Sequence, residues 1–178
     1  MLVASNILGR YYTSMGLDVK ISEVHGMAQR GGSVVTYVKC GEKVYSPLLE
    51  KGGADYILAF ETLEAMRWLG YLSPDGTIIV NNQQIYPVTV LNDKSNYPAF
   101  TAKGQNVKLY NAMEIAEEAG SVRAVNVVML GYLAAQCKNG NYEPWIRAIK
   151  ESLPEKLWDI NIKAFTTAYE KSGEFLCL

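Results

Sequence analysis

The chain has 178 residues, of which 49% are hydrophobic, and this is enough for one substantial core, so we expect a single domain over residues 1–178. Lys and Arg number 17 against 18 Asp and Glu. These charges are interspersed, and the chain therefore lacks the basic stripe typical of nucleic-acid binding. The apolar run Val122–Leu133 is broken by Arg123, Asn126 and Gly131 and is shorter than the ~20 residues of a membrane span. We expect neither a nucleic-acid partner nor a membrane anchor.

The cysteines lie far apart, at Cys40, Cys137 and Cys177. This spacing fits neither a disulfide framework nor the CxxC pairs of zinc and iron–sulfur sites. No secretory signal is recognisable at the start of the sequence. A reducing cytoplasm is the expected compartment.

The first part of the chain predicts a helix and two strands. Apolar residues at helical spacing predict a helix over Leu2–Met15. Leu17–Ile21 alternates with a period of two, as a half-buried strand does. Val34–Val38 is β-branched and aromatic, and Gly41-Glu42 could turn it into Lys43–Tyr45 as an antiparallel hairpin.

The middle of the chain predicts a strand-helix-strand unit. Asp55–Phe60 has the composition of a buried strand and runs directly into a helix over Glu61–Leu69. A turn at Ser73–Gly76 leads into the apolar strand Thr77–Asn81. The crossover between the two strands should be right-handed.

The last third predicts one short strand, Val107–Tyr110, followed by helices over Ala112–Ala119, Val122–Cys137, Trp145–Ser152 and Pro154–Lys171. Strands alternate with helices along the whole chain. The expected fold class is α/β, a three-layer α/β/α sandwich, with a mixed sheet because of the hairpin.

Polar groups are concentrated in the segment after the strand Leu17–Ile21. This position is the carboxyl edge of a sheet, where open α/β folds bind ligands. The segment holds the only histidine of the chain, and its glycines permit close backbone approach to a ligand or partner. The candidate residues are Glu23, His25, Gly26, Met27, Gln29, Arg30, Gly31 and Gly32.

A purely structural role is the alternative for each of these residues. Gly31-Gly32 can form a turn, Arg30 can be a solvated charge at the surface, and His25 can cap a helix. Ser46, Pro47 and Glu61 could contribute to the same sheet edge, but a turn proline and a carboxylate at a helix start explain them about as well.

The complete string Glu23-Val24-His25-Gly26-Met27-Ala28-Gln29-Arg30-Gly31-Gly32 resembles the signature of the small, gamma-type subunit of 2-oxoacid:ferredoxin oxidoreductases. Tyr45–Leu49, Ala54–Glu61 and Leu63–Ala65 are similar to the same family in the same order, so the resemblance spans at least residues 1–82. Within the family, the chain most resembles the indolepyruvate type, whose small subunit is called beta.

This resemblance implies a Rossmann-like fold and a place in a complex that decarboxylates a 2-oxoacid, preferably an aryl-pyruvate, to acyl-CoA and reduces ferredoxin. Thiamine diphosphate, iron–sulfur clusters and CoA then belong to the complex and none to this chain alone, since a larger alpha-type partner carries them. His25 and Arg30 could contact an anionic substrate or a CoA phosphate. Use of the loop only as a subunit interface is at least as well supported.

The sequence departs from the family pattern at its front. Family members begin with a strand and a G-x-G-G-Q-G turn before the helix that starts here at about Leu2, and neither is present. A start codon assigned too far downstream, a trimmed sequence and genuine divergence all stay open. The absence of this turn argues against nucleotide or CoA binding at the helix N-terminus. If the strand really is missing, we expect an open slot between its neighbours in the sheet, filled by a partner chain or by rearrangement.

Two other functions stay open. A stand-alone nucleotide- or CoA-binding module would bind ligand as the isolated chain. A scaffold without catalysis would keep only the fold. A homodimer of the isolated chain also stays open.

Overall fold

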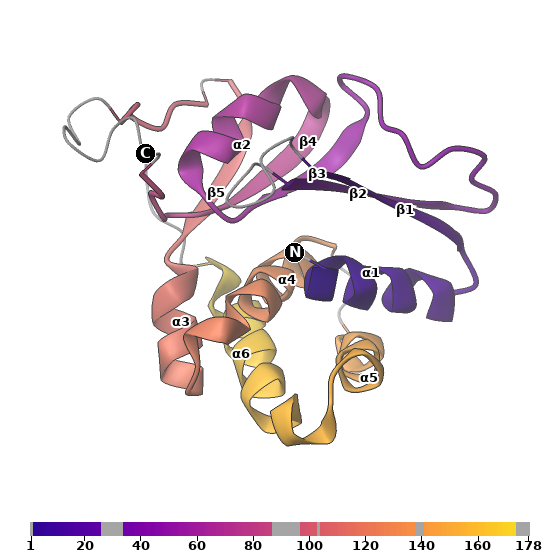
Figure 1. The fold of residues 1–178 in the computed structure, drawn as a ribbon, viewed down its shortest axis with the longest axis vertical. Helices are drawn as coiled ribbons and strands as arrows, with labels where there is room; N and C mark the ends of the chain where they lie inside the picture. The colour runs from indigo at the N-terminus through magenta and orange to yellow at the C-terminus, as the bar shows by residue number, and fades with distance from the viewer. Residues whose placement is uncertain (1, 26–33, 87–96, 103, 138–140, 174–178) are drawn as a thin grey trace.

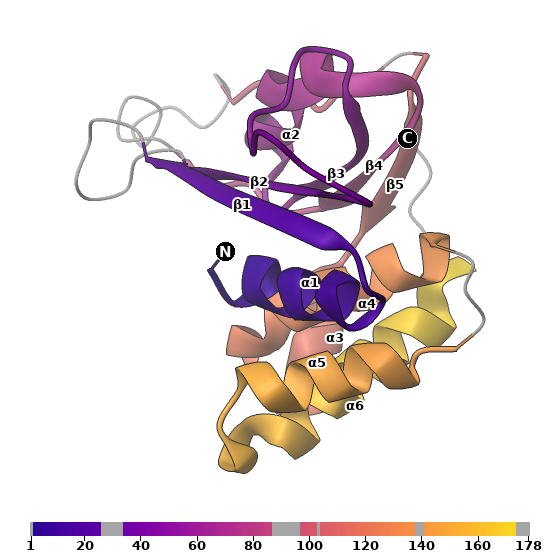
Figure 2. The same cartoon turned by 90° about the vertical axis from the view of Figure 1, so that its right-hand side faces the viewer.

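The computed structural model describes residues 2–25, 34–86, 97–102, 104–137 and 141–173. The strands lie in a middle layer, with one helix on one face and the remaining helices on the other (Figures 1 and 2). The elements are α1 (Leu2–Ser14), β1 (Asp18–His25), β2 (Val34–Gly41), β3 (Ala54–Ala59), α2 (Thr62–Trp68), β4 (Leu72–Asn81), β5 (Asn106–Tyr110), α3 (Ala112–Ala119), α4 (Val125–Gln136), α5 (Glu143–Ser152) and α6 (Trp158–Glu170). The predicted three-layer α/β class is confirmed.

Strands β3, β4 and β5 form a parallel sheet in that order. Successive residues of β4 pack on opposite faces because side chains alternate along a strand. Ile79 joins the core on the side of α4, whereas Ile78 and Val80 pack with Ala65 of α2. Burial on both faces explains why β4 is a continuous apolar run.

Strands β1 and β2 form an antiparallel hairpin from Asp18↔Gly41 to His25↔Val34. The prediction that β2 pairs with Lys43–Tyr45 was therefore wrong. The Val44 N–H instead donates to Asp18 Oδ2 at 2.9 Å, which ties this segment to the start of β1. Strand β1 also continues past its predicted end at Ile21, because the residues that follow find partners across β2.

The hairpin and the parallel sheet are separate sheets, and no ladder joins β2 to β3 among the described strands. Side chains connect the two parts near this break: Cys137, just after α4, lies close enough to Tyr12 of α1, Tyr56 of β3 and Cys40 of β2 for these groups to interact electrostatically. Burial raises the pKa of Cys137 and of Tyr12.

The main core lies between the parallel sheet and the larger helix layer, where Trp145 of α5 stacks on Tyr11 of α1 with ring centroids 3.8 Å apart. Helix α3 has its predicted bounds, and α6 starts at Trp158, later than predicted, after a 3-10 turn. The predicted turn Ser73–Gly76 lies inside β4, where it forms the register shift against β3 between the pairs Ala54↔Leu72 and Tyr56↔Thr77. Across the described residues, no helix has the length and apolar character of a membrane span.

Candidate functional site

Glu23 and His25 lie on β1, the first strand of the hairpin, and not on a loop as predicted. Their Cα partners on β2 are Thr36 and Val34, so the hairpin ladder fixes the backbone of both residues. Glu23 is half-buried. The remaining members of the predicted segment lie outside the described residues: Gly26, Met27, Gln29, Arg30, Gly31 and Gly32.

The hydroxyl of Thr36 is shut off from solvent and has no hydrogen-bond partner in the described structure. Directly paired residues of an antiparallel ladder share a face of the sheet, so this hydroxyl lies on the same face as Glu23. A buried hydroxyl without a partner is unusual in a folded protein. Thr36 was not predicted as a site residue from the sequence, because its position opposite Glu23 depends on the strand register.

Glu61 caps the N-terminus of α2 directly after β3. Its side chain is buried, with 6% exposed, and its Oε2 accepts a hydrogen bond from Glu64 N at 2.8 Å. Its Oε1 accepts from Ile85 N at 3.4 Å. The carboxylate is thus held at the sheet edge. Its contacts are those of a carboxylate that caps a helix start, which is the structural role that the sequence suggested for Glu61.

Asn81 connects the ends of β3 and β4 with the start of α3, and sequence analysis did not find it. It is fully buried. Its Nδ2 donates to Phe60 O at 3.2 Å and to Gln83 Oε1 at 3.1 Å, and its Oδ1 accepts from Ala112 N at 3.0 Å. The sequence feature that could have identified Asn81 is the run of amide side chains, Asn81 to Gln84, that starts where the apolar strand ends.

Ser46 and Pro47 do not join this network. Ser46 is exposed, and its Oγ accepts a hydrogen bond from Leu48 N at 3.2 Å, which stabilises its own turn. Pro47 is half-buried. Among the described residues, no hydrogen bond connects either of them with Glu61.

The carboxyl edge of the parallel sheet can orient a ligand or partner but offers little for covalent chemistry. Glu61 and Asn81 follow adjacent parallel strands there, and both are engaged by backbone groups. Burial raises the pKa of the thiols of Cys40 and Cys137, which disfavours the thiolates that iron–sulfur clusters need. Within the described ranges, no three metal-binding side chains lie together.

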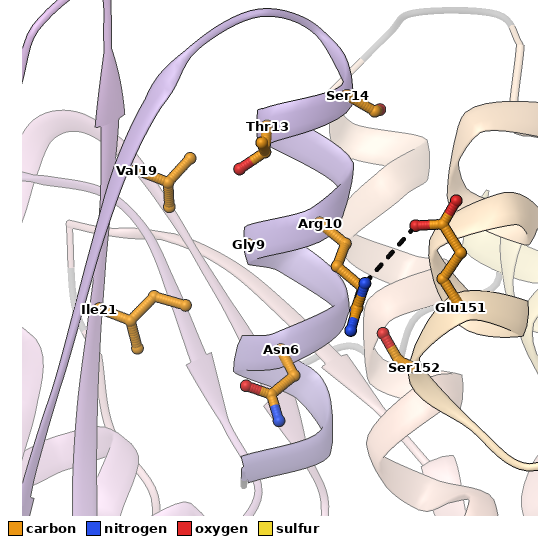
Figure 3. A pocket seen from close by; sticks show the side chains of 9 residues that line it. All are labelled: Asn6, Gly9, Arg10, Thr13, Ser14, Val19, Ile21, Glu151 and Ser152. Atoms are coloured by element: carbon orange, nitrogen blue, oxygen red, sulfur yellow. Dashed lines mark ion pairs between the residues drawn. The ribbon is translucent and has the colours of Figure 1, made fainter.

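A groove of about 570 Å³ lies between α1, β1 and α5, and none of the predicted site residues that the structure describes lines it (Figure 3). Val19 and Ile21 form its strand side, and Arg10 Nη1 lies 3.7 Å from Glu151 Oε2 on its helix side. Its lining consists of Asn6, Gly9, Arg10, Thr13, Ser14, Val19, Ile21, Glu151 and Ser152.

The family model for pyruvate ferredoxin/flavodoxin oxidoreductase matches residues 1–171 of this chain. The chain belongs to this family. It is 36% identical to the indolepyruvate oxidoreductase subunit IorB of Thermococcus kodakarensis over 187 residues, covering 100% of this chain and 93% of the relative. The subunit of the same name from Archaeoglobus fulgidus is 38% identical, and the matched region covers 96% of this chain and 89% of that relative. Pyruvate synthase subunit PorC of Methanothermobacter marburgensis is 23% identical, over 96% and 89%.

Solved structures share the fold of this family member. The gamma subunit of a keto/oxoacid ferredoxin oxidoreductase from Geobacter sulfurreducens has a TM-score of 0.70 at 20% identity, covering 97% of this chain and 90% of that one. The 2-oxoglutarate:ferredoxin oxidoreductase of Magnetococcus marinus has a TM-score of 0.72 at 16% identity, over 97% of this chain and 29% of that one. The gamma-type fold predicted from the sequence is confirmed.

Proposed function

We propose that this chain is the small subunit of a cytoplasmic 2-oxoacid:ferredoxin oxidoreductase, with indolepyruvate or a related aryl-pyruvate as substrate. The observation that supports this proposal best is the similarity, over nearly the whole length, to archaeal indolepyruvate oxidoreductase subunits. Identity to the pyruvate-type subunit is lower. The subunit works only within the complex.

The reaction removes CO2 from the 2-oxoacid, transfers the acyl group to CoA and delivers two electrons to ferredoxin. Thiamine diphosphate and iron–sulfur clusters supply the carbon and electron chemistry when bound. Among the described residues the cysteines are Cys40 and Cys137, too few for the four thiolates that hold a cluster, and burial raises the pKa of both thiols. We therefore assign these groups to a larger alpha-type subunit.

The part played by this chain is to position the active site from the end of the hairpin. The ladder of β1 and β2 fixes the backbone at Glu23 and His25. We infer that His25 and Arg30 contact an anionic group of the 2-oxoacid or CoA, Arg through its forked donors and His through its protonation near neutral pH. A loop that only binds the larger subunit is the competing explanation.

Co-expression with the larger subunit tests the proposed function. We expect a stable complex that reduces ferredoxin with indolepyruvate and CoA, at a higher kcat/KM than with pyruvate or 2-oxoglutarate. The isolated chain should show no turnover. Consistent recovery of the chain without a thiamine- and iron–sulfur-bearing partner would contradict the proposal.

Substitutions in the complex separate the two explanations of the hairpin end. We expect His25→Ala and Arg30→Ala to lower kcat/KM by about 10- to 100-fold while assembly, measured by native mass spectrometry, is unchanged. Lys39→Ala is the matched control, since Lys39 is an exposed cation on the same hairpin. Lost assembly in the two variants would assign the loop to the interface instead.

A further inference from the structure

In the part of the chain that the structure describes, the outer edge of strand β1 pairs with no other strand, and it runs along the rim of the molecule (Figures 1 and 2). Among the described strands, β1 pairs only with β2, so alternate N–H and C=O groups point away from the hairpin. Folded proteins protect such edges with lysine and other charged side chains, proline, a bulge or a very short strand. The lysine of β1, Lys20, is paired with Asp18 of the same strand at 3.2 Å. Strand β1 has eight residues, no proline and an uninterrupted register. This edge is open to another strand.

The groove between α1, β1 and α5 lies beside this edge (Figure 3). Val19 and Ile21 of β1 form one side of it, and 41% of Ile21 is exposed. Side chains alternate between the faces of a strand, so every second side chain of an added strand would enter the groove. Affinity would come from main-chain hydrogen bonds and specificity from the groove.

A second copy of this chain fits the edge poorly in each twofold register that would pair five or more residues of β1. Two β1 strands related by a twofold axis perpendicular to the sheet must pair residues that share a face. A twofold at Ile21 sets Val19 opposite Glu23, and a twofold at Ser22 sets Ile21 opposite Glu23. A twofold at Lys20 or at Glu23 sets like charges opposite each other, which is unfavourable. The edge therefore suits a strand of different sequence.

We propose that the free edge of β1 and the adjacent groove bind an extended segment of the larger subunit, which becomes the third strand of the hairpin sheet. This inference rests on the proposed function. The segment carries uncharged side chains toward the groove, because Val19 and Ile21 form one wall and Arg10 is already paired with Glu151. Its other side chains stay on the opposite face.

Hydrogen–deuterium exchange on the assembled complex and on the isolated chain tests the added strand at residue resolution. We expect alternate amides of β1 to exchange at least about tenfold more slowly in the complex. A complex in which β1 amides are unchanged would overturn the inference and leave the proposed function standing. Failure to form any complex would overturn both. Protection of β1 that rises with the concentration of the isolated chain would show a second copy on the edge and also overturn it.

A charge on the groove side of β1 provides an independent test. We expect Ile21→Lys to weaken assembly at least about tenfold, because the ammonium group would be buried against the added strand. Val122→Lys is the matched control, since Val122 is similarly exposed, at 48%, but lies between α3 and α4. Equal affinity of both variants would contradict the inference, and the exchange measurement on the unsubstituted chain decides it if Ile21→Lys does not fold.

Discussion

Asp18 shows how one side chain can fix the path of the chain. Its Oδ2 accepts the Val44 N–H and its Oδ1 lies 3.2 Å from Lys20 Nζ, and these contacts lower the pKa of the carboxyl group. They hold the segment after β2 against the start of β1. The sequence alone suggested a hairpin at this place, because Lys43–Tyr45 has strand character.

Asp18→Asn tests the contribution of this carboxylate to stability. A folded-state pKa below the unfolded value near 3.8 means that the stabilisation is present above pH 3.8 and is lost as the pH falls through the folded pKa. We expect Asp18→Asn to melt at a lower temperature at pH 7, and the difference from the unsubstituted chain to disappear in acid. Melting followed by circular dichroism from pH 7 down to acid measures this, and a difference independent of pH would contradict it.

Tyr110 supports the core through its hydroxyl, which donates to Ser172 O at 2.7 Å, and its ring stacks on Tyr132. Burial raises its pKa to about 12. We expect Tyr110→Phe to cost about 1 kcal/mol of unfolding free energy in urea at neutral pH. Because the folded pKa lies above the unfolded value of 10, this tyrosine also makes stability fall as the pH rises from 10 to 12. That part of the alkaline loss should be absent from Tyr110→Phe.

At the scale of elements, the helices and the parallel strands could be predicted because local patterns specify them. Helix α3 and strand β5 lie where hydrophobic spacing places them. Which strands pair with each other was harder to predict from the sequence. Residues 22–25 become strand only because β2 lies beside them. Ser73–Gly76 has turn composition and lies within β4, but none of its four residues has a partner on β3 because the register shifts there.

Helix α4 crosses α6 at Gly131, where a Cβ would collide with Phe165 O and lie 2.8 Å from Ala168 Cβ. Backbone atoms cannot yield there, so we expect Gly131→Ala to cost about 1–3 kcal/mol in urea unfolding. Gly9→Ala is the matched control in α1, because its Cβ would meet only the flexible end of Ile21 at 2.9 Å. An equal loss in both variants would mean that helix crossing is not the cause.

At the scale of the whole molecule, the two sheets should differ in local stability. No described residue of β1 or β2 is buried, whereas the last six residues of β4 all are. We expect hairpin amides of the isolated chain to exchange at least about tenfold faster than those of β4. Equal protection of the hairpin and β4, measured by hydrogen–deuterium exchange, would mean that the hairpin unfolds only together with the rest of the protein.

The sequence by itself determined the family, the α/β class and most helix bounds, because hydrophobic period and a ten-residue signature are local properties. The loop from Gly26 to Gly32 was identified in this way, although it lies outside the described residues. Only the tertiary structure decided that Glu23 and His25 lie on a strand, that Asn81 and Glu61 share the carboxyl edge, and that β1 has a free edge beside a groove. These features depend on contacts between residues far apart in the chain, which no local pattern specifies.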